Sequence, residues 1–183
     1  MEHAATDPTA ATAATATAGG REVAHHEAVV RVREALASAG ATGHVVVLDD
    51  HARTAAQAAE QLGVTVAQIA NSLVFAVPDG EAGRRPLLVL TSGAHRVDTE
   101  KVAALVGSPR LERADPEFVR STTGFVIGGV APVGHLTPLQ TLVDDALAVH
   151  DEVWAAAGHP RTVFATTFDE LVRITGGTPA TVA

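Results

Sequence analysis

The first half of the chain alternates between helix-like and strand-like apolar patterns. From Glu22 the apolar residues recur at helical spacing until Gly40, which is placed as a helix stop. Residues 44–48 form an apolar run of strand length. Thr54 then begins a capping-box pattern, which predicts a short helix that ends at Gly63.

Two strand-like runs in the middle of the chain predict a β-hairpin. Residues 73–77 and 86–91 are apolar and of strand length, and turn-forming Pro, Asp and Gly residues lie between them. A helix is predicted next over residues 99–106, because Gly107 is placed to stop it.

The second half continues with short elements. Asp115 suits a helix N-cap and Pro116 the first helical position, so a helix is predicted that ends near Gly124. Three strand-like runs follow, at residues 141–143, 149–155 and 162–165. An amphipathic pattern predicts a last helix over residues 167–175. Because strands and helices interleave without the regular rhythm of a doubly wound sheet, we expect an α+β fold with an irregular mixed sheet.

Residues 1–20 do not share these patterns. They are a run of Ala and Thr without apolar periodicity, so we expect a disordered tail. Acidic residues and a proline stand where a secretory signal would carry basic residues and an apolar core. Elsewhere no apolar run reaches about 18 residues, the length that crosses a bilayer. We therefore expect a single cytoplasmic domain over residues 21–183 that does not bind membranes.

Composition removes several kinds of chemistry. The 183 residues include no Cys, which excludes disulfide scaffolds, thiol catalysis and thiolate zinc sites. The net charge of −8 argues against broad attraction to nucleic acid but leaves local recognition open. Nine histidines invite a metal hypothesis, yet none has HExxH or HxH spacing, so no metal is expected. The GxSxG motif of serine hydrolases is also missing.

Residues 124–135 form a glycine-rich, apolar and nearly uncharged segment. Gly129 and Gly134 have the spacing of a phosphate-binding GxxxxG, but no lysine follows, and Pro132 lacks the N–H that would face phosphate. Nucleotide hydrolysis is therefore not expected. Two interpretations stay open: a tight turn between strands, or a loop whose N–H groups at Gly128 and Gly129 stabilise negative charge on an ester oxygen.

Three polar residues at the ends of predicted elements are further candidates. Asn71 stands at the entrance of an apolar strand, where its amide either points into a cleft or bonds the neighbouring backbone. Asp144 follows a strand and either positions a ligand group or caps a turn, and Asp145 beside it leaves the choice open. Thr54 is expected to be a helix cap, with substrate contact as the alternative.

A set of motifs, taken in order and spacing, resembles one family. The motifs are Thr54, Ala58-Ala-Glu-Gln-Leu-Gly-Val64, Gln68-Ile-Ala-Asn-Ser-Leu-Val-Phe75, Ala114-Asp-Pro-Glu117, Thr123-Gly-Phe125, Gly128-Gly-Val-Ala-Pro-Val-Gly134 and Val143-Asp144. Over residues 25–177 the chain resembles the YbaK family, also called the aminoacyl-tRNA editing or prolyl-tRNA synthetase-associated domain. This resemblance implies a compact α+β domain with a mixed, partly barrel-like sheet flanked by short helices.

The resemblance also implies a free-standing hydrolase that removes the amino acid from mischarged tRNA, without a metal, a cofactor or a protein nucleophile. In that mechanism the glycine-rich segment of residues 124–135, here called the glycine loop, holds the ester carbonyl. A hydroxyl of the terminal adenosine orients the attacking water. The catalytic candidates are Asn71, Gly128, Gly129 and Asp144. The substrate-binding candidates are His51, Thr54, Pro132, Gly134 and His135. The expected partner is the acceptor end of aminoacyl-tRNA, not DNA, and the expected state is a monomer or weak homodimer.

Asn71 departs from the family pattern, which usually has lysine at this position. The chain's single lysine, Lys101, lies in a predicted helix after a different strand. An amide cannot supply the lost charge, and a charge-assisted hydrogen bond is worth roughly 1.5–3 kcal/mol. Two classes therefore remain open: a divergent trans-editing deacylase, or a noncatalytic module that binds a small amino-acid-like ligand or a protein partner. The arginines expected to contact phosphates are Arg31, Arg33, Arg53, Arg84, Arg85 and Arg96.

Overall fold

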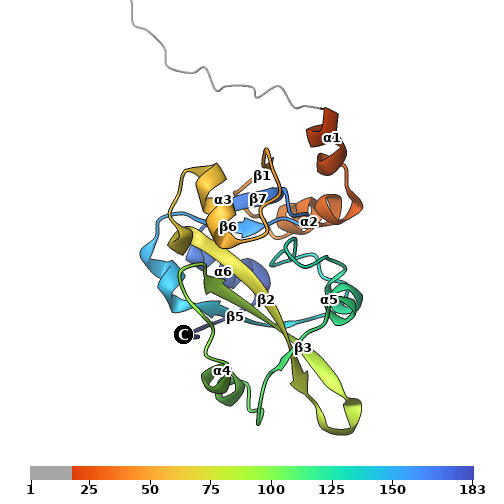
Figure 1. Ribbon diagram of the computed structural model, residues 1–183, viewed down its shortest axis with the longest axis vertical. Helices are drawn as coiled ribbons and strands as arrows, with labels where there is room; N and C mark the ends of the chain where they lie inside the picture. The colour runs from red at the N-terminus through yellow and green to blue at the C-terminus, as the bar shows by residue number, and fades with distance from the viewer. Residues whose placement is uncertain (1–17) are drawn as a thin grey trace, which may run out of the picture.

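The structure is a computed structural model that describes residues 18–183 (Figure 1). Its strands are β1 (Val45–Val47), β2 (Ile69–Pro78), β3 (Arg84–Ser92), β4 (Glu112–Arg113), β5 (Gln140–Asp144), β6 (Val153–Ala156), β7 (Thr162–Thr166) and β8 (Thr178–Ala180). They form an eight-stranded sheet in the order β1-β7-β6-β2-β3-β5-β8, with β4 also paired to β2. Antiparallel and parallel pairs both occur, so the predicted mixed sheet is confirmed. The sheet does not close into a barrel.

Short helices flank this sheet. They are α1 (Ala18–Ala24), α2 (Glu27–Ser38), α3 (Ala55–Leu62), α4 (Thr99–Leu105), α5 (Pro116–Thr123) and α6 (Phe168–Thr175), with 3-10 turns η1 (Val66–Gln68), η2 (Gly80–Ala82) and η3 (Asp145–Val149). The predicted caps are confirmed for α3 and α5. Thr54 Oγ1 accepts from the N–H of Gln57, and the Asp115 carboxylate accepts from that of Phe118. A left-handed glycine follows each helix, at Gly63 and Gly124.

The single helix predicted from Glu22 to Gly40 is wrong, because the chain forms α1 and α2 instead. His26 has an extended ψ of 132°, and its side chain accepts from the N–H of Ala28 to cap α2. Arg33 donates to the carbonyl of Ala24, the last residue of α1. Of the expected tail, residues 1–17 lie outside the described residues, and residues 18–20 belong to α1.

The strand predicted over residues 149–155 also begins too early. The Asp144 carboxylate accepts from the N–H of Ala146 and starts η3, so β6 begins only at Val153. The predicted hairpin is confirmed as β2 and β3, which pair antiparallel from Ala70 opposite Ser92 to Pro78 opposite Arg84.

The core lies on both faces of the β2–β3 hairpin. Leu88 and Leu90 of β3 pack in the main cluster with α2, α5 and α6, while Leu87 and Val89 pack with Val102 of α4. Successive side chains of a strand point to opposite faces, so burial on both faces explains why β3 reads as a continuous apolar run. A third, smaller cluster joins α3 to the start of β2. In the described part of the chain, no helix has the length and apolar character to traverse a membrane.

Candidate active site

One edge of β2 is only partly covered. β3 pairs with the whole length of the other edge, whereas β6 pairs with the first two residues of this edge, and β4 pairs with Phe75 and Ala76. Within the described residues no strand pairs with residues 71–74 on this side. The gap lies where α3, β6 and the loop after α5 approach the hairpin (Figure 1).

The hydrogen-bond pattern shows which backbone groups face this gap. The N–H of Gly93 donates to the carbonyl of Ile69, so the odd-numbered residues of β2 are the ones that bond β3. Hydrogen-bonded pairs alternate along an antiparallel ladder. The N–H and C=O groups of Ser72 and Val74 therefore point toward the open edge, where a bound molecule can reach them.

A cavity of about 480 Å³ occupies this place. Its apolar walls come mainly from α3, η1, β6 and the glycine loop. Its polar lining residues are Arg53, Thr54, Asn71, Ser72 and Thr162. A second hollow of about 530 Å³ shares Ser72, Leu73 and Gly128 with the first. Volumes of this size suit small organic ligands.

Asn71 and Ser72 line the first cavity from opposite faces of the sheet. Ile69 packs against α3, and alternation places Asn71 on that same face. Its amide makes no hydrogen bond to any residue that the structure describes. The hydroxyl of Ser72 is buried and also has no partner among those residues. Such an orphan costs roughly 1–3 kcal/mol, so a water molecule or a ligand group at the gap would satisfy it.

The glycine loop supplies a tight turn to the cavity wall. The N–H of Gly129 donates to the carbonyl of Val126 at 2.9 Å, and Gly128 has a φ of +91°. A type II turn needs positive φ at its third residue, which explains the glycine. Gly128 lines both hollows, as does Ile127, whose side chain is 60% exposed. Gly129 has already used its N–H, and a Cβ there would meet the backbone of His159 at 3.0 Å.

The end of the glycine loop faces away from Asn71. Pro132, Gly134 and His135 line a separate hollow that also contacts α6. The ring of His135 bonds the carbonyl of Ala131 through Nε2 at 2.7 Å and packs edge-on against Phe125. Burial lowers the pKa of His135, and the nearby charge of Arg31 lowers it further. These three predicted substrate-binding residues are therefore not brought together with Asn71.

Arg31, which was expected to contact phosphate, instead holds the glycine loop. Its Nε donates to the carbonyl of Gly134 at 2.7 Å, and its Nη2 donates to that of Gly124 at 3.1 Å. The guanidinium also lies 4.9 Å from the centre of the Phe125 ring. One side chain of α2 thus fixes both ends of the loop.

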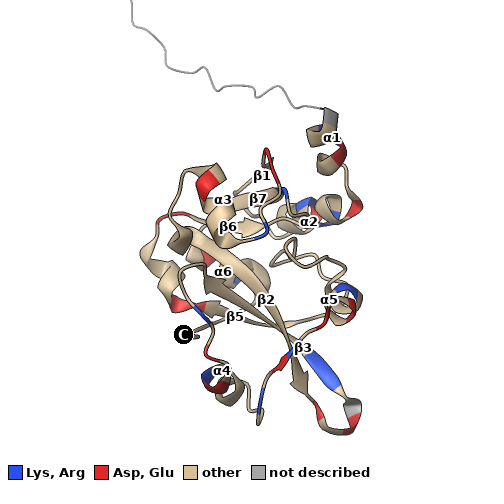
Figure 2. Cartoon of the chain, viewed as in Figure 1, with Lys and Arg blue, Asp and Glu red and all other residues tan. Residues whose placement is uncertain are grey.

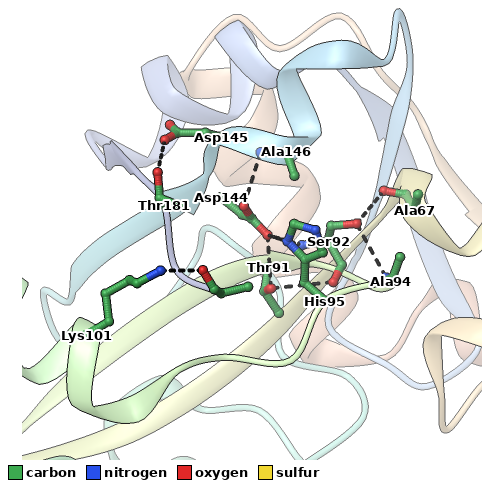
Figure 3. A network of polar contacts seen from close by, with 11 residues as sticks. Ala67, Thr91, Ser92, Ala94, His95, Lys101, Asp144, Asp145, Ala146 and Thr181 are labelled. Atoms are coloured by element: carbon green, nitrogen blue, oxygen red, sulfur yellow. Dashed lines mark hydrogen bonds and ion pairs between the residues drawn. The ribbon is translucent and has the colours of Figure 1, made fainter.

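Asp144 is buried and supports the strand beside Asn71 (Figure 3). Its carboxylate accepts from Thr91 Oγ1 and from the N–H of Ser92, and it lies 2.9 Å from Nδ1 of His95. Thr91 is the cross-strand partner of Asn71. Asp144 does not line the cavity, so in this arrangement it holds the neighbouring residues rather than facing a ligand.

Arg53 is the charged residue among those that line the cavity. Its guanidinium makes no hydrogen bond or ion pair with any residue in the described range 18–183. Lys101 lies on α4 and donates to the carbonyl of Ala183. The positive charge in the cavity lining therefore comes from Arg53, which lies just before α3. The sequence alone did not place Arg53 beside Asn71.

The remaining two candidates lie before α3. Thr54 both caps the helix and lines the cavity, so its two expected roles are compatible. His51 is not among the cavity-lining residues, and its ring contacts that of His159. In residues 18–183 no group of three or more His, Asp and Glu side chains is arranged to hold a metal ion.

Sequence reasoning missed Ser72, Ile127 and Trp154 as parts of this site. Ser72 follows Asn71 within a quoted motif, and Ile127 directly precedes Gly128, so their proximity to recognised positions was a usable signal. No such signal existed for Trp154, because β6 comes next to Ile69 and α3 only when the sheet forms.

Comparison with known proteins identifies the family. The model of the aminoacyl-tRNA editing domain matches residues 49–174. The chain belongs to this family. It is 31% identical over 127 residues to the "Uncharacterized protein YwhH" of Bacillus subtilis (strain 168), covering 69% of this chain and 78% of that protein. The editing domain thus extends over the cavity, α3 and the glycine loop.

Two further relatives carry functional names. The "Putative Cys-tRNA(Pro)/Cys-tRNA(Cys) deacylase EbsC" of Enterococcus faecalis (strain ATCC 700802 / V583) is 26% identical over 110 residues, covering 60% of this chain and 64% of that protein. A crystal structure of "a putative trans-editing enzyme for prolyl tRNA synthetase" is 46% identical with a TM-score of 0.77, and the match covers 85% of this chain and 96% of that one. The expected family and fold are therefore confirmed.

Proposed function

We propose that the protein is a free-standing aminoacyl-tRNA deacylase that acts in the cytoplasm and holds the aminoacyl ester in the cavity at the open edge of β2. The observation that carries this proposal is the meeting of Asn71, Gly128 and Arg53 around one apolar hollow. Membership of the editing-domain family and the names of the relatives support the same activity.

In the proposed reaction a water molecule attacks the carbonyl carbon of the ester that joins the amino acid to the terminal ribose. The bond to the ribose oxygen breaks, that oxygen takes up a proton, and the free amino acid and tRNA leave. The N–H of Gly128 has no hydrogen bond to any residue of the described chain and lies at the cavity wall. It is suited to stabilise negative charge on the carbonyl oxygen.

Asn71 and Arg53 have complementary parts in this mechanism. The amide of Asn71 can accept from the attacking water and donate to the substrate at the same time. The guanidinium of Arg53 brings the positive charge that the amide lacks, and it suits a phosphate of the tRNA end. The mechanism uses no metal, no cofactor and no protein nucleophile.

The test is the loss of ester from a panel of aminoacyl-tRNAs, each carrying a different amino acid. We expect the parent protein to deacylate one or a few members of the panel. Arg53→Gln should raise KM for that substrate by about tenfold, the scale of one lost charged contact. Lys101→Gln is the matched control, because it removes the same charge from α4 and should leave KM unchanged.

Absence of hydrolysis across the whole panel would contradict the proposal and favour a noncatalytic ligand-binding module. Equal effects of Arg53→Gln and Lys101→Gln would contradict the role of Arg53, because a general charge effect does not depend on position.

A further inference from the structure

Three histidine rings gather beside the cavity, although they lie far apart in the sequence. His26 precedes α2, His51 lies between β1 and α3, and His159 lies in the turn between β6 and β7. The ring centres of His26 and His159 are 5.4 Å apart, and those of His51 and His159 are 5.7 Å apart. His26 and His51 are exposed and His159 is half-buried, so solvent and ligands can reach the group.

Backbone contacts fix the tautomers of two of these rings. Nδ1 of His26 accepts from the N–H of Ala28, and Nδ1 of His159 accepts from the N–H of Arg161. A neutral imidazole whose Nδ1 accepts carries its proton on Nε2. Both rings therefore offer an Nε2–H donor even when they are neutral, and neither donor is satisfied by a residue that the structure describes.

The charges around the rings also favour an anion. Arg161 belongs to the same turn as His159 and reaches across to the carbonyl of Leu48. Burial lowers the pKa of His159, and the positive charges of His26, His51 and Arg161 lower it further. A bound anion would relieve that repulsion.

The acidic residues beside these segments do not neutralise the group. Glu27 follows His26, and Asp49 and Asp50 precede His51. None of the three forms an ion pair with the rings or with Arg161 among the described residues. The other charged or titratable residues close to these segments in the sequence are Arg21, Glu22, His25 and Arg53.

The histidine group is joined directly to the cavity. The N–H of Ala52, next to His51, donates to the carbonyl of Pro160, next to His159, and both Ala52 and Pro160 line the cavity. The glycine loop touches the backbone of His159 at the position of Gly129. A molecule whose ester lies in the cavity would thus extend its next charged group toward the rings.

We propose that His26, His51, His159 and Arg161 form a phosphate site that binds the RNA backbone next to the terminal nucleoside of the substrate. This site rests on the proposed function for the identity of its ligand. Phosphate oxygens accept from the two Nε2–H donors, which the neutral rings already carry, and from the guanidinium of Arg161. Affinity for the acceptor end therefore depends on these side chains and decreases as salt is added.

The experiment measures binding of a fluorescent RNA hairpin with a single-stranded CCA end, by anisotropy at one pH over a series of salt concentrations. The test variant is His26→Asn with His51→Gln, because Asn still caps a helix N-terminus and His51 makes no side-chain hydrogen bond among the described residues. The matched control is His44→Gln, an exposed histidine at the opposite end of β1.

We expect the parent and His44→Gln to bind the hairpin equally, and the double variant to bind it several-fold more weakly, because it lacks the rings of His26 and His51. The slope of log affinity against log salt should fall by about 0.7 in the double variant, the value for one single-strand phosphate. A second hairpin carries an uncharged methylphosphonate at its last linkage. The parent should bind it with the same loss of affinity and of salt slope, and the double variant should bind it no more weakly than the parent does.

Unchanged affinity and salt slope in the double variant would overturn the site. The assignment of the ligand as an RNA phosphate would be overturned if the parent bound both hairpins equally while inorganic phosphate stabilised it through these histidines. The outcome is separable from the proposed function. If the histidines contribute to binding but no aminoacyl-tRNA of the panel is hydrolysed, only the proposed deacylase activity is contradicted. If an aminoacyl-tRNA is hydrolysed but binding does not depend on the histidines, only this site is contradicted.

Discussion

In the proposed mechanism, Asn71 supplies the hydrogen-bonding group and Arg53 supplies the positive charge that one lysine would bring to the cavity. Asn71 sits on β2, where the ladder with β3 and the buried network of Asp144 and Thr91 hold its backbone. Arg53 lies before α3 and is exposed, so its cation can adjust to a phosphate at the cavity entrance. An exposed cation at the cavity suits local recognition of RNA by a protein whose net charge of −8 repels phosphate at long range.

Replacing Asn71 tests this division. Asn71→Ala should slow deacylation by roughly tenfold or more, the scale of one lost hydrogen bond, because the alanine cannot hydrogen-bond the substrate or its water. Asn71→Lys should bind tRNA more tightly with a steeper salt dependence, since one more phosphate contact releases more counterions. Steady-state kinetics and binding at several salt concentrations measure both effects.

Val149→Lys is the control for the added charge, because Val149 is 79% exposed and not among the cavity-lining residues. If Val149→Lys steepens the salt dependence as much as Asn71→Lys does, the effect belongs to net charge and not to the cavity. Unaltered kinetics in Asn71→Ala would remove this residue from the mechanism.

His135 should make the stability of the fold depend on pH. Burial holds its pKa below the ordinary value of 6.5. Below that value the unfolded chain binds more protons than the folded chain, so the contribution of His135 is present above pH 6.5 and is lost as the pH falls toward the folded pKa. Urea unfolding between pH 7.5 and pH 5 should show a smaller decrease in His135→Gln than in the parent. Equal decreases in the two proteins would show that His135 does not titrate differently on folding.

At the scale of elements, the sequence predicted those parts whose signals are local. The caps at Thr54 and Asp115, the left-handed glycines and the β2–β3 hairpin all depend on neighbouring residues, and all were found. The break at His26 was not predicted, because Arg33 and Ala28 stabilise it through side-chain contacts that no periodicity shows. The two- and three-residue strands β4 and β8 exist only through pairing with distant partners.

The site was predicted in part for the same reason. Asn71, Gly128 and Thr54 were recognised from motifs and do line one cavity. Pro132, Gly134 and His135 share the motif but face another hollow, because the turn at Gly128 and the contacts of Arg31 redirect the chain. The histidine group could not be found from spacing, since its members come from three separate connections.

Arg31 should control the glycine loop as a unit. Arg31→Met keeps much of the apolar stem but removes the bonds to Gly124 and Gly134 and the contact with Phe125. We expect the free energy of unfolding to fall by about 1–3 kcal/mol, and KM for aminoacyl-tRNA to rise because the cavity wall loses its anchor. Urea unfolding and kinetics measure the two effects. Arg33→Met is the control, since the guanidinium of Arg33 donates to the carbonyl of Ala24 and, among the described residues, to no residue of the loop. Equal effects on KM would contradict the assignment.

At the scale of the whole molecule, charge is distributed away from the cavity. Figure 2 shows basic residues at the start of β3, where Arg84 and Arg85 lie, and acidic residues over several helices and loops. Arg84 stacks on Phe118, and Arg85 bonds Gln140 and the carbonyl of Val106, so these cations are engaged within the fold. RNA is therefore expected to approach through the few free cations near the cavity rather than through a broad basic face.

Helix α1 begins at Ala18, so residues 18–20 belong to it. Residues 1–17 carry no apolar periodicity, so their deletion should leave the melting temperature and the deacylation rate unchanged. Deleting residues 1–20 should lower the melting temperature, because it removes the first turn of the seven-residue helix α1 together with the buried Gly20. A loss of about 1 kcal/mol corresponds to a decrease of about 2–4 °C in a chain of this size. Thermal unfolding of both truncated chains beside the parent measures the difference. A decrease already present after deletion of residues 1–17 would show that this segment packs on the domain, and equal melting temperatures for all three chains would show that α1 contributes nothing to stability.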